Sequence, residues 1–464
     1  MTFIGLLRQE LSDSAVLTSP EYDFAPHFSD LIMTSPPGAD PIGVAFPGST
    51  EEVSKIFRLA QEHGVTIVPQ GGLTGMAGGA LPIGPSLLLS LKKMNAIEEI
   101  DPDSMTVTVQ AGTILQNVHE ACEAQGLMFP LDFGGRGSAQ IGGVISTNAG
   151  GNRVLRYGMT RDLVLGLEVV LPDGSVLNML HKMLKNNTGY DLRQLFIGAE
   201  GTLGIVTRAT LKLVPLVQPA LTALCALEDY DAALAFLRMA REDLGSDLTS
   251  FEAMWPNYFA VGTKGAGRPS PFAEEAGIYV LIETMNRSGN VEGGQALLEK
   301  ACEEGLLLDA VAAASLRDVQ KLWEIRESTD VMTRMYGEMA HFDASIPTGE
   351  IGKFLAEFEH RLLGKFPDAV YAVFGHIADG NLHMAVQIDD EVPELEVEDM
   401  TYELIGEWGG AVSGEHGIGI HKVPYLQYSR GKDELALMRT IKNAIDPNNI
   451  LNPGKVVPEI QALD

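Results

Sequence analysis

The stretch Pro69-Gln-Gly-Gly-Leu-Thr-Gly75 decides how the N-terminal half of this chain is organised. Before it, residues 49–63 have the apolar spacing of an amphipathic helix, Gly64 ends that helix, and the apolar run 65–68 predicts a buried strand. Glycines that follow a strand let backbone N–H groups approach a phosphate. The spacing is neither G-x-G-x-x-G nor the Walker pattern, and prolines follow in place of a helix. The stretch therefore predicts either a phosphate-binding loop or an ordinary tight loop, and it supports neither a Rossmann nor a P-loop fold.

Two more glycine-rich tracts lie further along the chain. One runs from Asp132-Phe-Gly-Gly-Arg-Gly-Ser138 to Thr147-Asn-Ala-Gly-Gly151, and the other is Gly198-Ala-Glu-Gly-Thr-Leu-Gly204. Three loops of closely approachable backbone, with Ser, Thr and Asn among the glycines, predict a long ligand of dinucleotide size. We expect residues 40–215 to form one α/β domain around that ligand.

After Val214-Pro-Leu-Val-Gln-Pro219 the sequence pattern changes, and it predicts alternating strands and helices with few glycines. This alternation favours an antiparallel sheet covered by helices. The expected elements are strand 221–226, helix 230–243, strand 277–284, helix 291–304, helix 315–337, strand 340–346, helix 349–363 and strand 369–375.

The stretch His376-Ile-Ala-Asp-Gly-Asn-Leu-His383 carries the strongest chemical signal. Apolar residues on both sides predict two short strands, and Asp379-Gly380 predicts a two-residue type I′ turn between them. With that turn His376 lies directly opposite His383, with Cβ atoms about 4.5–5.5 Å apart on one face of the sheet. We assign Asp379 and Asn381 to shaping the turn.

Further on, Ser413-Gly-Glu-His-Gly417 offers two more polar groups. Glu415 provides a third ligand oxygen beside His376 and His383, and His416 is a candidate base. Two histidines and one carboxylate with an open position suit a divalent metal, zinc first, with manganese or iron as alternatives.

Composition limits the partners of this 464-residue chain. Its formal net charge of −29 opposes binding to nucleic acid, so a site for an acid must supply its own positive charge. The sequence contains no run of about 18 apolar residues, so we do not expect an integral membrane protein. Three scattered cysteines predict a reducing compartment, and we expect a cytoplasmic protein whose assembly is open, a homodimer included.

Five ordered motifs resemble those of FAD-linked D-2-hydroxy-acid dehydrogenases, in the vanillyl-alcohol-oxidase/p-cresol-methylhydroxylase (PCMH) superfamily. The motifs are Pro69-Gln-Gly-Gly-Leu-Thr-Gly75, Ile141-Gly-Gly143, Thr147-Asn-Ala-Gly-Gly151, Gly198-Ala-Glu-Gly-Thr-Leu-Gly204 and Asn452-Pro-Gly-Lys455. The similarity is strongest to the branch with D-2-hydroxyglutarate dehydrogenase, D-lactate dehydrogenase and the flavin subunit of glycolate oxidase.

The resemblance implies an α+β fold, in which a two-part PCMH-type FAD-binding domain encloses an α+β substrate cap domain in the sequence. We therefore expect an N-terminal segment at 1–39, the FAD-binding domain at 40–218 and the cap at 219–400. A C-terminal segment at 401–464 is expected to complete the metal and flavin sites.

The resemblance also implies noncovalent FAD, because Leu73 stands where some superfamily members attach the flavin through a histidine. The residues expected to bind FAD are Pro69, Gly71, Gly72, Leu73, Thr74, Gly75, Asp132, Gly137, Ser138, Gly142, Gly143, Thr147, Asn148, Gly150, Gly151, Gly201, Gly204, Ile205 and Asn452.

The expected reaction is FAD- and metal-dependent oxidation of a D-2-hydroxy acid to the 2-oxo acid. Arg326 matches the family arginine that binds the substrate's carboxylate, and His416 would take the hydroxyl proton while flavin N5 receives the C2 hydride. Electrons would leave to an electron-transfer flavoprotein or a quinone, because the sequence carries no NAD fingerprint.

Three expected substrate contacts depart from the hydroxyglutarate enzymes, which carry threonine, lysine and asparagine where this chain has Asp330, His341 and Ala385. Asp330 would repel a second carboxylate unless Arg334, one helical turn later, neutralises it. We therefore expect a D-lactate-like or larger monocarboxylate. The alternatives are a D-2-hydroxyglutarate dehydrogenase, an oxygen-using sugar or aldonate oxidase, a flavin subunit of a multisubunit glycolate oxidase, and a metallohydrolase.

Overall fold

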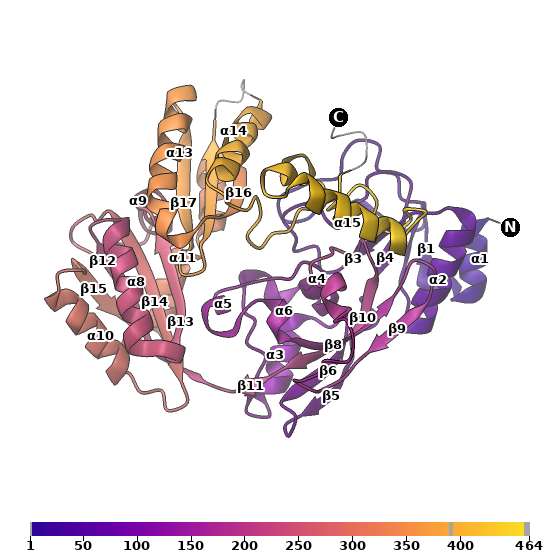
Figure 1. The fold of residues 1–464 in the computed structure, drawn as a ribbon, viewed down its shortest axis with the longest axis horizontal. Helices are drawn as coiled ribbons and strands as arrows, with labels where there is room; N and C mark the ends of the chain where they lie inside the picture. The colour runs from indigo at the N-terminus through magenta and orange to yellow at the C-terminus, as the bar shows by residue number, and fades with distance from the viewer. Residues whose placement is uncertain (1, 389–392, 459–464) are drawn as a thin grey trace. The chain divides into compact units, whose positions relative to one another are not determined.

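The computed structural model describes residues 2–388 and 393–458, which form two compact units (Figure 1). The first unit comprises Met1–Gly151, Gly158–Leu216 and Glu415–Asp464, and the second comprises Asn152–Tyr157 and Val217–Gly414. The chain thus leaves the first unit, builds nearly all of the second, and returns at Glu415. The yellow helix α15 (Lys432–Ile445) and the indigo N-terminus of Figure 1 consequently belong to the same unit.

The first unit contains two main sheets. The four-stranded sheet has the order β1 (Val16–Leu17), β2 (Gly43–Ala45), β4 (Leu87–Ser90) and β3 (Ile67–Gln70). The five-stranded sheet has the order β5 (Ile97–Asp101), β6 (Thr106–Gln110), β10 (Ile205–Lys212), β8 (Val164–Val170) and β9 (Val176–Met179). A short ladder joins β7 (Leu127–Met128) to β11 (Val214–Pro215). The five-stranded sheet is antiparallel, whereas β2, β4 and β3 run parallel.

The helices of the first unit are mostly short, and the longest begin and end at clear signals. Besides α15 they are α1 (Phe3–Glu10), α2 (Thr50–His63), α3 (Leu115–Glu123), α4 (Ile141–Ser146), α6 (Thr160–Leu163) and α7 (Arg193–Phe196). Helix α2 confirms the predicted helix: the Ser49 side chain accepts from the Glu52 backbone N–H, and Gly64 ends the helix at φ 64°.

The second unit is one seven-stranded antiparallel sheet with helices on both faces. The strand order is β15 (Asp309–Ala312), β12 (Gln218–Leu227), β14 (Ile278–Asn286), β13 (Leu248–Met254), β17 (Val370–His376), β18 (Asn381–Gln387) and β16 (Ala340–Ser345). Its helices are α5 (Val154–Tyr157), α8 (Tyr230–Leu244), α9 (Pro256–Ala260), α10 (Glu292–Glu303), α11 (Leu316–Arg326), α12 (Thr329–Tyr336), α13 (Ile351–Lys365) and α14 (Glu394–Glu407).

This sheet consists of two similar halves. The first half runs β12-α8-β13-β14-α10-β15 with strand order 15-12-14-13, the split βαβ arrangement. The second half runs β16-α13-β17-β18-α14, and its fourth strand is reduced to a single bridge between Ser345 and Ala411. Two ladder pairs, Ala253 with Gly375 and Met254 with Phe374, join β13 to β17 and so connect the halves. A hydrogen bond from the Trp255 N–H to the Val373 carbonyl (3.1 Å) continues this connection.

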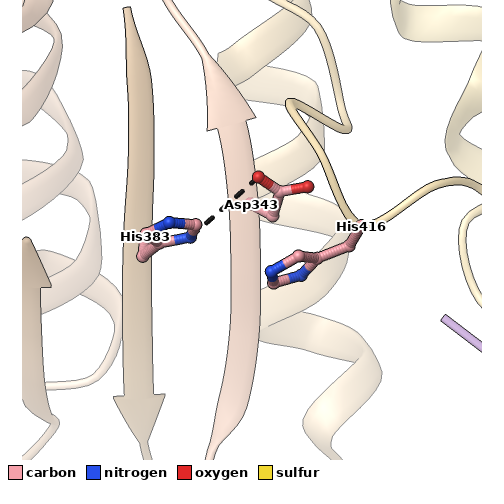
Figure 2. A group of neighbouring side chains, drawn as sticks. All are labelled: Asp343, His383 and His416. Carbon is pink, nitrogen blue, oxygen red and sulfur yellow. Dashed lines mark ion pairs between the residues drawn. The ribbon is translucent and has the colours of Figure 1, made fainter. Parts of the chain in front are cut away.

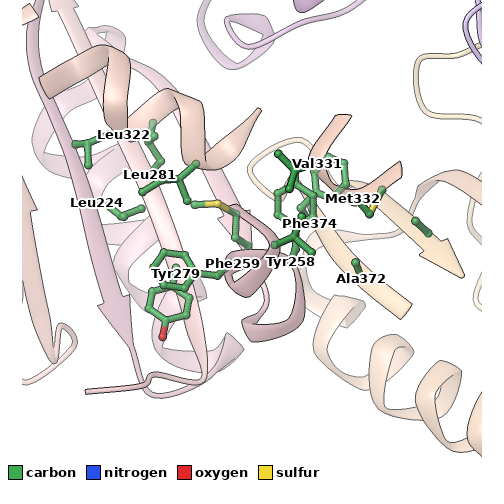
Figure 3. Close-up of a cluster of buried hydrophobic side chains, with 14 of the residues drawn as sticks. Leu224, Tyr258, Phe259, Tyr279, Leu281, Leu322, Val331, Met332, Ala372 and Phe374 are labelled. Carbon is green, nitrogen blue, oxygen red and sulfur yellow. The ribbon is translucent and has the colours of Figure 1, made fainter. Parts of the chain in front are cut away.

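The two faces of the sheet are covered by different helices. Helices α8, α10, α13 and α14 cover one face, where Phe236 of α8 lies 5.6 Å from Phe251 of β13 between ring centroids. Helices α9, α11 and α12 cover the other face and share its apolar core, part of which Figure 3 shows around Tyr258, Phe374 and Leu322. The candidate site described below lies on this second face.

Two expectations for the second unit were wrong. The single helix expected at 315–337 is divided into α11 and α12, because the Ser328 hydroxyl donates to the Glu324 carbonyl at 2.6 Å and accepts from Arg268 at 3.2 Å. Strand β13 was not expected, since its sequence LTSFEAM mixes polar and apolar residues, yet all seven are buried.

No helix in residues 2–388 and 393–458 is both long enough and apolar enough to cross a membrane.

Candidate active site

The glycine tracts expected to bind FAD come together within the first unit. A Cβ on Gly72 would collide with the Ser138 carbonyl, so the first and second loops pack backbone against backbone. The Glu200 N–H donates to the Ser146 carbonyl at 2.7 Å, which joins the third loop to α4. The Asn452 amide donates to the carbonyls of Gly79 (3.0 Å) and Glu200 (2.8 Å) and ties in the C-terminal motif.

These loops fit an extended ligand that contacts backbone. Leu73, Asn148, Glu200 and Asn452 adopt positive φ angles between 46° and 54°, a conformation that non-glycine residues adopt rarely and mainly at functional sites. A Cβ on Gly143 would meet nothing within 4 Å, so the chain has open space beside the start of α4. The combination of close backbone packing and open space suits a dinucleotide such as FAD.

Buried charges hold the same loops, and sequence reasoning assigned them no role. The Glu200 carboxylate accepts from the N–H groups of Ile418 (2.7 Å) and Gly419 (2.8 Å), and burial raises its pKa. Burial also lowers the pKa of Lys455 to about 7, and its ammonium donates to the Asn452 side chain at 2.6 Å. The motif residues Glu200 and Lys455 therefore fix the loops that follow His416 and contain Asn452.

In the second unit the histidine hairpin differs from the prediction. His376 pairs with Asn381, and His383 pairs with Phe374, so four residues rather than two connect β17 to β18. The predicted direct opposition of His376 and His383 was therefore wrong. Because the shift amounts to two residues, both histidines still lie on the same face of the sheet. Their ring centroids are 5.4 Å apart.

Strand pairing gathers further polar residues on this face. Asp343 pairs with His383, and His341 pairs with Ala385, across β16 and β18. Extending the β13–β17 pairing by one residue sets Glu252 opposite His376. These polar residues thus lie side by side on one face of the sheet, across β13, β17, β18 and β16. In the following text they are called the polar band.

Glu252 bridges two of the predicted site residues. One carboxylate oxygen, Oε1, lies 2.8 Å from His376 Nδ1, and the other, Oε2, accepts from Arg326 Nε (3.0 Å) and Nη2 (2.8 Å). Burial raises the pKa of Glu252, but the charges of His376 and Arg326 reverse that effect and the net shift is downward. Burial likewise opposes the charge on Arg326, and Glu252 more than offsets it, so the pKa of Arg326 is raised. The pair is therefore ionised.

Arg326 is held on two further sides. Its guanidinium lies 4.7 Å from the centroid of the Phe374 ring, and Tyr258 stacks on Phe374 with centroids 4.0 Å apart. The Tyr258 hydroxyl donates to the Arg326 carbonyl at 2.8 Å, where α11 ends. The arginine that the sequence placed on an amphipathic helix is thus 6% exposed and fixed in position.

Asp343 is a buried carboxylate that sequence reasoning missed. It accepts from the Asn381 amide (2.8 Å), the Ser413 hydroxyl (3.0 Å) and the Gly414 N–H (3.1 Å). Its oxygen lies 4.0 Å from His383 Nδ1. Asp343 therefore fixes the chain immediately before Glu415 and His416.

Two groups of side chains have a geometry that could hold a metal ion. Ligand atoms of His376, His383 and Glu415 lie within 4.8 Å of one another, and so do those of Asp343, His383 and His416. Figure 2 shows the second group, in which His383 and Asp343 come from neighbouring strands and His416 from the loop after Gly414. The first group is the ligand set expected from the sequence, and two imidazoles with one carboxylate suit zinc.

An unsatisfied acceptor supports a ligand at this face. Because Asn381 Nδ2 donates to Asp343 and to the Ala344 carbonyl (3.1 Å), the amide orientation is fixed. The remaining Oδ1 is buried and accepts no hydrogen bond from any residue that the structure describes. Buried acceptors are rarely left without a donor, so a ligand or an ordered water would satisfy Oδ1. Asn381 thus does more than shape the turn.

The three expected specificity residues lie in different surroundings. Asp330 and Arg334 form the expected ion pair at 2.9 Å on α12, and both side chains are about two-thirds exposed. His341 and Ala385 lie on the face of the histidine pair, two residue pairs further along the strands than Asp343 and His383. Burial, followed by the charge of His383, lowers the pKa of His341, so this imidazole is neutral near pH 7.

Comparisons with known proteins identify the family and the fold. Residues 217–456 match the family "FAD linked oxidases, C-terminal domain", and residues 41–180 match "FAD binding domain". A D-2-hydroxyglutarate dehydrogenase of Stutzerimonas stutzeri is 36% identical over 456 residues, covering 96% of this chain and 95% of the relative. One of Xanthomonas citri pv. viticola is 38% identical over 425 residues, covering 90% and 89%. The fold is similar to p-cresol methylhydroxylase (TM-score 0.80, 18% identity, 99% and 97% covered).

The replacement Asp343→Asn should loosen the loop that ends at Gly414. An amide has one acceptor oxygen in place of two. Either the Ser413 hydroxyl and the Gly414 N–H, which share Oδ2, or the Asn381 amide, which donates to Oδ1, then loses its acceptor, at about 1–3 kcal/mol of stability. Hydrogen exchange of the peptide around 413–414 should accelerate, and the urea midpoint should fall. The matched control is Asp368→Asn, which removes the same charge from an exposed turn. Unchanged exchange in Asp343→Asn would contradict the anchoring role.

Proposed function

This chain belongs to the FAD-linked oxidase family, within its D-2-hydroxy-acid dehydrogenase branch, and on that premise we propose that it oxidises D-2-hydroxyglutarate to the 2-oxo acid. It is an FAD-dependent oxidoreductase that acts on the CH–OH group of a D-2-hydroxy acid. The observation that carries the proposal is the polar band on one sheet face, where the histidine pair and a buried arginine are connected through Glu252.

Each residue has a defined task in the proposed reaction. His376, His383 and Glu415 hold a divalent cation, zinc first, and Arg326 binds the substrate's 1-carboxylate through its planar fork. His416 takes the proton from the 2-hydroxyl at a ring nitrogen. When bound, FAD accepts the C2 hydride and the cation polarises the hydroxyl. The residues expected to bind FAD keep that role, with Glu200 and Lys455 holding their loops.

The second carboxylate of hydroxyglutarate has a candidate partner in His341. Its neutral imidazole can donate one hydrogen bond, and it lies on the same face as His383. The objection from Asp330 weakens because Arg334 neutralises that carboxylate. The names of the relatives favour the same substrate.

A monocarboxylate such as D-lactate is the second candidate. It is favoured by Ala385, which is buried beside His341 and offers no hydrogen bond where the hydroxyglutarate enzymes carry asparagine. The noncovalent state of the flavin and the identity of the electron acceptor, an electron-transfer flavoprotein or a quinone, stay predictions.

Steady-state assays with an artificial electron acceptor separate the two substrates. We expect kcat/KM for D-2-hydroxyglutarate to exceed that for D-lactate by at least roughly tenfold. D-lactate has no second carboxylate, so the His341 N–H would have no acceptor on that substrate. The L-enantiomer of 2-hydroxyglutarate serves as the control for stereochemistry. A higher kcat/KM for D-lactate would establish the monocarboxylate instead.

Removal of the metal should abolish turnover without removing the flavin. Dialysis against a chelator is expected to give protein that keeps its yellow absorption and lacks activity, and added zinc should restore the rate; manganese and iron are the comparisons. Elemental analysis identifies the metal before and after dialysis. Full activity in protein shown to be metal-free would refute the metal's role.

The replacement His416→Ala should remove the base. The expected fall in kcat is about 10²–10⁴-fold, with the flavin spectrum unchanged. His360→Ala, which changes an exposed histidine of α13, controls for the loss of an imidazole. Equal rates in wild type and His416→Ala would assign the proton to another group.

A further inference from the structure

Glu252 is the residue through which the cation ligand and the carboxylate-binding arginine are joined. It is 2% exposed and comes from β13, whereas His376, His383 and Asp343 come from the other half of the sheet. Its two oxygens have separate partners, since Oε1 contacts His376 Nδ1 and Oε2 contacts Arg326. A carboxylate that only neutralised the arginine would not need the second contact.

The contact with His376 selects one form of the imidazole. A carboxylate only accepts hydrogen bonds, so Nδ1 must carry a proton, and in the neutral imidazole Nε2 is then the nitrogen that carries the lone pair. A histidine that donates one N–H to a carboxylate is oriented and made more basic as a metal ligand through its other nitrogen. Glu252 therefore prepares His376 for the cation.

The contact with Arg326 selects one edge of the guanidinium. Nε and Nη2 both donate to Oε2, at 3.0 and 2.8 Å, so Glu252 occupies the side edge of the group. A guanidinium has five N–H donors, and its other edge, formed by Nη1 and Nη2, keeps a parallel pair for a second carboxylate. Phe374 lies against the face of the guanidinium and limits its rotation.

We propose that Glu252 is the positioning residue of the active site, which orients His376 through Oε1 for the cation and Arg326 through Oε2 for the substrate's carboxylate. The proposal rests on the proposed function for the identity of the cation and the substrate. It makes one side chain set the distance between the metal ligand and the carboxylate-binding group. The substrate's hydroxyl and carboxylate must match that distance together.

The chain offers a matched control in Glu283. This glutamate of β14 is 6% exposed and lies on the same face of the sheet, since its neighbour in the strand pairing is Ser250, two residues before Glu252. Its carboxylate accepts from Thr222 (3.2 Å) and from the Trp323 indole (3.1 Å). Glu283→Gln thus removes a buried charge from the same sheet face as Glu252→Gln.

The test compares zinc affinity and kinetics in Glu252→Gln and Glu283→Gln. The purified flavoprotein is depleted of metal and titrated with zinc alone against a competing chelator. In Glu252→Gln we expect the zinc Kd to rise by roughly 10–100-fold, the range for lost partners of metal ligands, with flavin absorption retained. KM for the hydroxy acid should rise by a larger factor than kcat falls, because Glu252 no longer holds the Arg326 guanidinium in the orientation that binds the substrate's carboxylate. Glu283→Gln should change neither quantity beyond experimental error.

Each outcome decides the proposal. Equal losses of zinc affinity in the two variants, or unchanged zinc Kd and KM in Glu252→Gln, would overturn it, as would wild-type protein that binds no zinc. If Glu252→Gln fails to fold, Glu252→Asp takes its place, since it keeps the charge but is one methylene too short to reach both partners. The zinc titration needs no substrate, so it still tests the contact with His376 if the wild type oxidises no 2-hydroxy acid.

Discussion

An ionised carboxylate at position 252, removed from water, is the constraint on which the second unit depends. A buried charge is tolerated only with partners of opposite sign and complete hydrogen bonding, and Arg326 and His376 provide both. To reach Glu252, α11 must end at Arg326 over the sheet, and β17 must lie beside β13. Three features accompany the contacts of Glu252 with Arg326 and His376. They are the division between α11 and α12, the stacking of Tyr258 on Phe374, and the orientation of His376.

Period-two alternation explains why a wrong turn still gave the correct face. The sequence predicted a two-residue connection at Asp379-Gly380, and the structure has four residues there, with His376 paired to Asn381. A shift of one residue would have sent one histidine to the opposite face, whereas a shift of two keeps both on the same face. The two histidines share a face whenever the number of residues that connect the strands is even, and both two and four are even. The prediction of adjacent histidines therefore depended on this even number more than on the type of turn.

Local signals made some elements predictable, and long-range contacts account for those that were missed. Ser49 and Gly64 define the two ends of α2 through contacts with residues close to them in sequence. Glycine loops after a strand are likewise a local signal, which predicts a phosphate site without reference to distant residues. Glu252 and Asp343 could not be found in this way, since each looks like a surface carboxylate in a short strand. Their importance comes from residues 124 and 70 positions away, respectively His376 and Ser413. The break after Arg326 likewise depends on Ser328 and Arg268.

The narrow junction between β13 and β17 has an evolutionary consequence. The two halves of the sheet have the same order of strands and helices, as expected if a single ancestral module had been duplicated and fused. Glu252 belongs to one copy, whereas His376, His383 and Asp343 belong to the other. Neither copy holds a complete set of polar groups, so recombination that exchanged one copy alone would separate Glu252 from His376. The contact between Glu252 and His376 therefore couples the two modules, although the ladder between β13 and β17 is short.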